Sequence, residues 1–218
     1  MGIEILDWFG STPAPGMQAK WTVLDEGQPR LKDAESVLGY RPDAIQTAEQ
    51  AAPGTKVVIA IGDPEDRARC WEAALLAGLE PCMLVHQTAT VAQSSVLGDG
   101  AIIGPFSYIG PLATIESNAL VNVHSTVGHD GFLGHSSVLS PYAAILGKAR
   151  CGSHSLLASR ATILPGKELG SFSKLDAGTV MRSDAPDGSL VSGEPARHRV
   201  IFTAPAQPAG KRKVSGAN

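Results

Sequence analysis

Residues 89–184 can be written as sixteen consecutive hexads: ATVAQS, SVLGDG, AIIGPF, SYIGPL, ATIESN, ALVNVH, STVGHD, GFLGHS, SVLSPY, AAILGK, ARCGSH, SLLASR, ATILPG, KELGSF, SKLDAG and TVMRSD. The third residue of each is Val, Leu, Ile, Cys or Met, and the first is Ala, Ser, Gly or Thr except where Lys167 opens the hexad. An amphipathic helix repeats near 3.6 residues and a half-buried strand near 2, so neither explains a sustained period of six. This period is typical of a parallel β-helix built from hexapeptide repeats.

The hexad pattern also predicts how this β-helix is stabilised. Each hexad would be a short strand plus a corner, and three hexads, about 18 residues, would make one triangular coil. The third residue would point to the axis. One coil cannot bury it alone, so stability would come from stacking about five coils. Gly at the fourth position of many hexads suits a corner where a side chain would collide or where φ is positive.

The composition limits the function classes open to this chain. With 43% apolar and 18% charged residues over 218 positions, it is globular and long enough for one large or two small domains. A net charge of −3 gives no general attraction to nucleic acid or to an anionic membrane. No apolar run is long enough for a membrane span, and no signal peptide is evident. The three cysteines follow no metal or disulfide spacing, which indicates reduced thiols and a cytoplasmic location.

A βαβ unit is predicted just before the repeat. Residues 57–61 (VVIAI) form a continuous apolar run, typical of a strand buried on both faces, which ends at Gly62 and Asp63. Residues 65–79 follow with helical spacing and an acidic first turn. Residues 81–85 (PCMLV) suggest a second strand, so a small parallel sheet with a flanking helix is expected. Further upstream, residues 21–24 suggest a strand and residues 45–51 a helix.

Of the six histidines, His129 is the strongest candidate for a catalytic residue. It is followed by Asp130 in the sequence VGHDGFLG, at a predicted corner of the β-helix. A carboxylate beside an imidazole orients the ring and makes it a better proton acceptor, which is what a general base requires. Any other single histidine at a corner is more typical of a surface residue.

These features resemble the NeuD/PglD type of sugar acetyltransferase, a branch of the left-handed β-helix, hexapeptide-repeat acyltransferases. The resemblance extends over residues 57–199 and rests on the hexads and on four motifs: VVIAIGDPEDR, LVHQTATV, NVHSTVGHD and DAPDGSLVSGEPAR. It implies a Rossmann-like α/β domain for a nucleotide sugar at residues 1–86. It further implies a left-handed parallel β-helix with a closing segment at residues 87–202, and a flexible tail at residues 203–218.

The resemblance implies an acetyl-CoA-dependent transferase that acts on a sugar amine or hydroxyl, expected to be a nucleotide-linked amino sugar for bacterial surface-glycan synthesis. It also implies a homotrimer with active sites between neighbouring subunits. His129 would take the proton of the attacking group and Asp130 would support it, with no metal required because the thioester is already activated. Other matched positions would bind substrate (Asn122, Gly62 and Asp63) or acetyl-CoA (Gly147, Ser159 and Ala177).

Two departures from the family pattern stand out. Members often carry a second histidine nine residues after the catalytic one, and Val138 occupies that position. Members also open with a strand and a Gly-rich loop that places a phosphate on a helix N-terminus, whereas this sequence opens with MGIEILDWF. A sheet that lacks its first strand would expose an unpaired edge, so we expect about a dozen more N-terminal residues in the natural product.

Two other function classes remain open at the level of sequence. Carbonic anhydrases of the γ class bind zinc on the same prism through three histidines, and His124 and His129 have the spacing of two of them. The third would fall near Thr88, so that zinc site would be incomplete. The second alternative is a non-catalytic β-helix that acts as a scaffold subunit.

Overall fold

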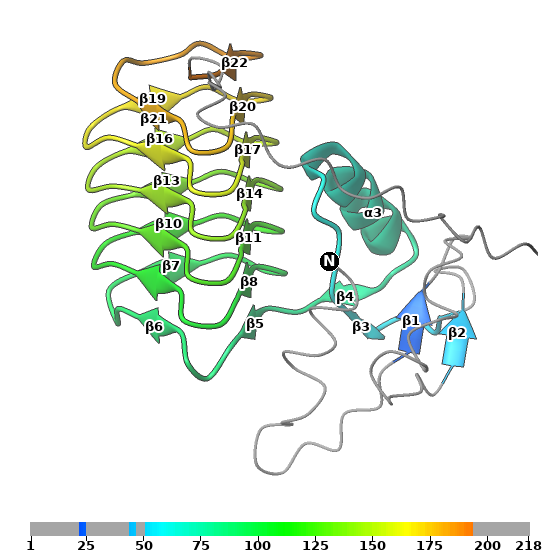
Figure 1. Cartoon of the computed structure of the whole chain (residues 1–218). Coiled ribbons are helices and arrows are strands. Elements are labelled where there is room, and N and C mark those ends of the chain that lie inside the picture. The colour runs from blue at the N-terminus through cyan, green and yellow to red at the C-terminus, as the bar shows by residue number, and fades with distance from the viewer. Residues whose placement is uncertain (1–21, 25–43, 47–50, 194–218) are drawn as a thin grey trace, which may run out of the picture.

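The computed structural model describes residues 22–24, 44–46 and 51–193. Its largest part is a parallel β-helix of about six stacked triangular coils, with one helix, α3, lying along its side (Figure 1). Each strand of the β-helix is two residues long, and each inner strand pairs in parallel with the equivalent strand of the coils above and below. Leu120, for example, pairs with Ile102 on one side and Val138 on the other.

The strands of the β-helix form three parallel sheets, one on each side of the prism. The β7–β19 sheet contains β7 (Val96–Leu97), β10 (Thr114–Ile115), β13 (Phe132–Leu133), β16 (Arg150–Cys151) and β19 (Glu168–Leu169). The β6–β21 sheet contains β6 (Thr90–Val91), β9 (Tyr108–Ile109), β12 (Thr126–Val127), β15 (Ala144–Ile145), β18 (Thr162–Ile163) and β21 (Val180–Met181). The β5–β22 sheet contains β5 (Leu84–Val85), β8 (Ile102–Ile103), β11 (Leu120–Val121), β14 (Val138–Leu139), β17 (Leu156–Leu157), β20 (Lys174–Leu175) and β22 (Leu190–Val191).

The hexad register predicted from the sequence is confirmed. The third residue of every hexad from Ile103 to Leu175 is completely buried, and together these residues form one continuous core along the axis. Val91 and Leu97, in the first coil, are only partly buried, because no described residues form a further coil beneath them. The small first residues, such as Ala143, are buried in the same core, as the pattern predicted.

The repeat begins earlier than residue 89. Leu84–Val85 (β5) pairs with β8, so these residues are already the first rung of the β-helix. The prediction of one strand over residues 81–85 is therefore wrong. Glu80–Pro81 (β4) belongs to the α/β unit and Leu84–Val85 to the prism, because the chain must turn from one to the other between them.

Side chains close the far end of the prism after the hexads stop. The side-chain oxygens of Asp184 and Asp187 accept hydrogen bonds from the backbone N–H groups of Glu168 and Ser171, at 3.0 and 2.7 Å. In the coil below, the equivalent of Glu168, Arg150, donates its N–H to the backbone carbonyl of Lys167, and the equivalent of Ser171, Ser153, donates to Ser171 Oγ. The two aspartates thus replace part of a missing coil and keep backbone donors satisfied.

Two reasons were predicted for glycine at the fourth hexad position, a steric collision or a positive φ, and only the collision applies. A Cβ at Gly134 would lie 2.7 Å from the backbone carbon of Gly152 in the next coil, so a side chain collides there. The positive φ, however, falls on the sixth residue of every hexad from residues 95–100 to 173–178, and most of these residues are not glycine. Asn118 and Asp130, with φ near 55°, are among them.

The predicted βαβ unit is present as β3 (Lys56–Val57), α3 (Pro64–Leu76) and β4, with β3 and β4 parallel. The hydrogen-bonded part of the first strand is shorter than residues 57–61. Val58 and Ala60 pack on the outer face of the β5–β22 sheet, whereas Ile59 packs against α3. The segment is therefore covered on both faces, as predicted, although one of those faces belongs to the β-helix rather than to a layer of helices.

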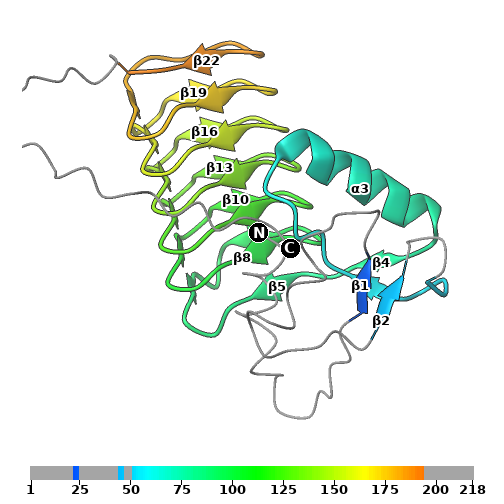
Figure 2. The ribbon, with the colours of Figure 1, turned by 45° about the vertical axis from the view of Figure 1, so that its right-hand side comes forward.

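Helix α3 lies beside the β-helix (Figure 2). Two of its residues, Trp71 and Arg67, are buried and connect the helix to the β-helix. Trp71 lies against Gly100, where a Cβ would come 3.1 Å from its ring carbon Cη2. The Arg67 guanidinium donates to the carbonyl oxygens of Ile59, Ile61 and Asn118, and burial lowers its pKa to about 9. It stays charged near neutral pH and ties helix, strand and prism together.

The predicted Rossmann-like domain is seen only in part. Besides the βαβ unit, β1 (Thr22–Leu24) and β2 (Ala44–Gln46) form a two-stranded parallel sheet. The strand predicted at residues 21–24 is confirmed, but the helix predicted from residue 45 is wrong at its start, because Ile45 pairs with Val23 in that sheet. The opening residues MGIEILDWF, where the sequence departs from the family pattern, lie outside the described residues. In the described part of the chain, no helix is long and apolar enough to cross a membrane.

Candidate active site

His129 and Asp130 lie at the corner that follows β12, at the edge of the β6–β21 sheet. The backbone of this corner is fixed from both sides, since Asp130 N–H donates to the carbonyl of Pro111 (2.9 Å) and the His129 carbonyl accepts from Lys148 N–H (2.8 Å). Asp130 has a φ of 55°, a left-handed conformation that Asp tolerates better than most residues. This turn brings its carboxylate back beside the preceding imidazole.

The two side chains form the acid–imidazole pair that the sequence suggested. Nδ1 of His129 lies 2.7 Å from Oδ2 of Asp130, and the side chains are 60% and 41% exposed. With Nδ1–H donating to the carboxylate, the second ring nitrogen, Nε2, carries the lone pair and can accept a proton. The pair is open to solvent within one copy of the chain, so a substrate can reach it.

Gly147 lies one coil beyond His129 in the same corner column, as the register predicted. The imidazole rests directly against it, with Cε1 and Cδ2 at 2.8 and 2.9 Å from the place of a Cβ. In the described part of the chain, no acceptor takes the backbone N–H of Gly147. The imidazole of His129 and the backbone of Gly147 therefore lie in direct contact at this corner.

Three other predicted residues lie together at the opposite edge of the same sheet. Asn122 is at the corner before β12, and Ser159 and Ala177 are at the corners before β18 and β21. Within one copy the structure therefore does not bring them to His129. Asn122 is 2% exposed and its side-chain oxygen accepts from Val123 N–H at 2.7 Å. Ser159 and Ala177 are exposed.

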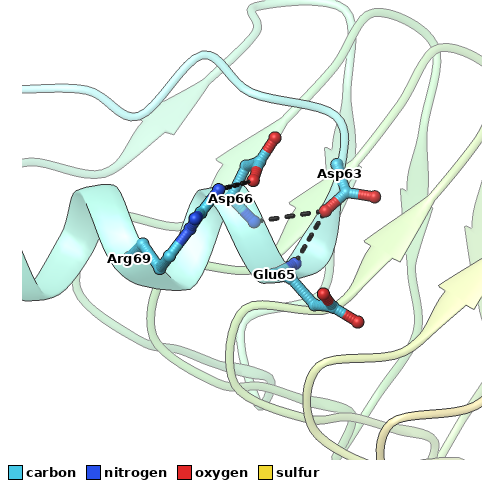
Figure 3. Close-up of polar contacts among 4 residues, drawn as sticks. All are labelled: Asp63, Glu65, Asp66 and Arg69. Carbon is cyan, nitrogen blue, oxygen red and sulfur yellow. Dashed lines mark hydrogen bonds and ion pairs between the residues drawn. The ribbon is translucent and has the colours of Figure 1, made fainter.

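Gly62 and Asp63 lie at the start of α3. Asp63 is the N-cap of the helix, and its Oδ1 accepts from the backbone N–H groups of Glu65 and Asp66 at 3.0 and 3.1 Å (Figure 3). This cap satisfies two donors that the first helical turn leaves free. The carboxylate thus occupies the positive end of the helix, where an anion would otherwise bind.

The two histidines nearest to the pair in sequence have other surroundings. His124 is stacked between Phe106 and Tyr142, with ring centroids at 5.0 and 4.8 Å, at the far edge of the sheet from His129. Among the residues that the structure describes, no group of three His, Cys, Asp or Glu side chains could hold a metal ion. Within one copy, His124 and His129 therefore do not converge as a pair of metal ligands.

His135 lies at the third corner of the prism, beside α3. Its Nδ1 is 2.8 Å from Ser117 Oγ, and its ring meets Trp71 edge-on at 5.9 Å. Burial lowers the pKa of His135, and His154 lowers it further. Val138, which stands where relatives often have a second histidine, is buried under Val58 and Ala60 in the contact between prism and α/β unit. This position cannot meet a substrate at the His129 corner.

Sequence reasoning missed the contacts that Gly100 and Gly147 make with aromatic rings. Gly100 is the sixth residue of its hexad and Gly147 the fifth, and other residue types occupy these positions in other hexads. For the contact between His129 and Gly147, the signal in the sequence is a glycine 18 residues beyond the histidine in the same register. Whether the imidazole touches that glycine depends on the rotamer of His129.

Comparison with known proteins gives a consistent result. No family model matches the chain. A 58-residue segment, 27% of the chain, is 38% identical to the presumed acetyltransferase YvoF of Bacillus subtilis (strain 168). That segment spans 33% of the length of this curated relative.

Solved structures match over most of the chain. PerB from Caulobacter crescentus, in complex with CoA and GDP-perosamine, has a TM-score of 0.67 and 25% identity, over 83% of this chain and 97% of PerB. The acetyltransferase domain of PglB from Neisseria gonorrhoeae FA1090 has a TM-score of 0.65 and 25% identity, over 81% of this chain and 98% of the domain. WeeI from Acinetobacter baumannii AYE, at 18% identity, shares the fold. The resemblance to hexapeptide sugar acetyltransferases with a left-handed β-helix is confirmed, and the comparisons support an acyltransferase.

Proposed function

We propose that the chain is an acetyl-CoA-dependent sugar acetyltransferase in which His129 is the general base. The observation that carries the proposal is the hydrogen-bonded His129–Asp130 pair, placed one coil from Gly147, whose N–H has no acceptor among the described residues. The same fold in PerB and in the PglB domain, which were solved with CoA and acetyl coenzyme A, supports the choice of acyl donor.

The reaction follows from the geometry of the pair. An amine or hydroxyl of the sugar attacks the thioester carbonyl, and Nε2 of His129 takes its proton as the new C–N or C–O bond forms. The C–S bond then breaks and the thiolate of CoA receives the proton back from the imidazolium. Asp130 orients the ring and stabilises its charged form. The free N–H of Gly147 would donate to the thioester carbonyl oxygen, where negative charge develops.

A homotrimer would complete the site. His129 and Gly147 border one edge of the β6–β21 sheet, and Asn122, Ser159 and Ala177 border the other. In a closed ring of three copies, different patches of each copy meet, so one edge can face the opposite edge of the neighbour. Acetyl-CoA would lie between them, with Ser159 and Ala177 contributed by the second copy.

The outer face of the β6–β21 sheet supports this arrangement. Its outward residues carry no charge in any of the six strands: Thr90, Tyr108, Thr126, Ala144, Thr162 and Val180. Phe106, Leu112 and Tyr142 flank it with 59%, 62% and 48% of their surface exposed. Clustered exposed apolar side chains of this kind mark interaction surfaces.

The substrate we propose is a nucleotide-linked amino sugar used for bacterial surface glycans, modified in the cytoplasm. Support comes from GDP-perosamine, which PerB holds, and from the parallel β3–α3–β4 unit beside the prism. Residues 1–86 would form the nucleotide-sugar domain, 87–202 the acyltransferase domain and 203–218 a tail. Gly62 and Asp63 would approach the substrate at the start of α3, through their backbone since the Asp63 carboxylate already caps the helix.

The test is release of CoA from acetyl-CoA, measured with a thiol reagent against a panel of nucleotide-linked amino sugars. We expect turnover with at least one acceptor and a loss of about 10²–10⁴-fold in kcat for His129→Ala. His154→Ala is the matched control, because it removes a histidine at the third corner of the prism, away from both edges of the β6–β21 sheet. Full activity of His129→Ala would refute the mechanism. Absence of transfer with every acceptor would favour the scaffold alternative.

A further inference from the structure

The His129 ring occupies the space that a side chain at residue 147 would need. A Cβ built on Gly147 would come 2.8 Å from Cε1 and 2.9 Å from Cδ2 of the imidazole, and closer still to Nε2. Carbon atoms in contact normally stay about 3.5–4.0 Å apart, so the imidazole cannot keep this position once residue 147 carries a side chain.

This contact differs from those of the glycines that build the prism. A Cβ at Gly110, Gly128 or Gly134 would meet the backbone of the next coil, so these glycines let the coils stack. At Gly147 the three nearest atoms all belong to the imidazole of His129. Lys148, the following residue, carries the positive φ of this corner, so Gly147 is not required for the turn itself. Glycine at residue 147 therefore leaves room for the imidazole of His129.

Building on the proposed function, we infer that Gly147 is a positioning residue for His129, separate from any backbone contact that it makes to the acyl donor. The imidazole is held at one end by Asp130, through Nδ1, and its Nε2 edge lies over the bare α-carbon of Gly147. A methyl group at residue 147 would force the ring to rotate away and break the bond to Asp130. A base displaced by about 1 Å can lose 10²-fold in rate.

The first test is spectroscopic and does not depend on activity. In protein with ¹⁵N-labelled histidine, we expect the His129 Nδ1 resonance to show a proton shared with Asp130, and Gly147→Ala to remove this signature. Gly166→Asn is the matched control. It lies at the same corner in the next coil, at the sixth hexad position, where Asn118 shows that Asn is accepted, and no atom lies within 4 Å of its Cβ position. Unchanged His129 resonances in Gly147→Ala would overturn the inference.

The second test separates positioning from donor binding. We expect Gly147→Ala to lower kcat by about 10–100-fold with KM for acetyl-CoA within about threefold, and to have no further effect in a His129→Ala background. Gly166→Asn should leave both constants unchanged. An equal loss in the His129→Ala background would show that Gly147 acts on the donor rather than through the imidazole, and would also overturn the inference. If no acceptor supports turnover, the proposed function fails while the spectroscopic test still decides the role of Gly147.

Discussion

At the scale of single residues, neighbours in the next coil decide what a histidine can do. His129 and His135 occupy equivalent places in consecutive hexads, yet one faces solvent with a carboxylate partner and the other packs against Trp71. The hexad places both at corners, and the sequence does not show that α3 covers only one of those corners. The exposed histidine is available for proton transfer, and the covered one contributes to the stability of the fold.

His135 makes the stability of the fold depend on pH. Burial and His154 lower its pKa in the folded state, while Ser117 and Glu116 oppose this shift. Above a pH of about 7 the ring is neutral in both states. As pH falls through the unfolded value of about 6.5, only the unfolded chain binds the proton, so stability is lost. We expect urea midpoints to fall between pH 7.5 and 5, and less steeply for His135→Gln. Parallel curves for the two proteins would contradict this.

At the scale of elements, the coils approach so closely that side-chain size at the fourth hexad position is limited. Gly134 and Gly152 lie in consecutive coils with no room for a methyl group between them. Ala158 occupies the same hexad position elsewhere, so the limit is local to particular corners. The recurrence of glycine predicted either a collision or a positive φ at the fourth position. The collision is the reason there, and the positive φ falls two residues later.

We therefore expect Gly134→Ala to destabilise the protein by about 1–3 kcal/mol, because the coils must move apart to admit the methyl group. Chemical denaturation monitored by circular dichroism measures the change. The reverse substitution at an equivalent position, Ala158→Gly, should cost less than about 1 kcal/mol, since it creates no clash. Equal effects of both substitutions would mean that the contact between coils is not limiting.

At the scale of the whole molecule, the prism is a stack in which stability depends on neighbours. A residue in the middle, such as Ile145, is buried completely by the coils on both sides, whereas Val91 in the first coil is buried on one side. In repeat folds of this kind each unit gains most of its stability from the units it touches. The loss of stability on truncating an axial side chain should therefore depend on its position along the axis of the prism.

Truncation of axial residues tests this dependence. Ile145→Ala should cost about 2–5 kcal/mol, because it leaves a cavity between two coils. Val91→Ala should cost only about 1 kcal/mol, because less apolar surface is withdrawn from water there. Urea denaturation of the two variants gives the comparison. A first-coil variant as damaging as the central one would show that the α/β unit, rather than the stack, limits stability.

The sequence by itself determined the prism, its register and the His129–Asp130 pair, because a six-residue period with apolar third positions has one efficient way to bury them. Hydrogen bonds between coils depend on that register alone. Only the tertiary structure decided that Val58 and Ala60 cover one side of the prism, that Trp71 fills the space beside Gly100, and that the His129 ring fills the space beside Gly147. These contacts join residues from different elements, and their fit depends on rotamers and on the close approach of coils, which no local pattern encodes.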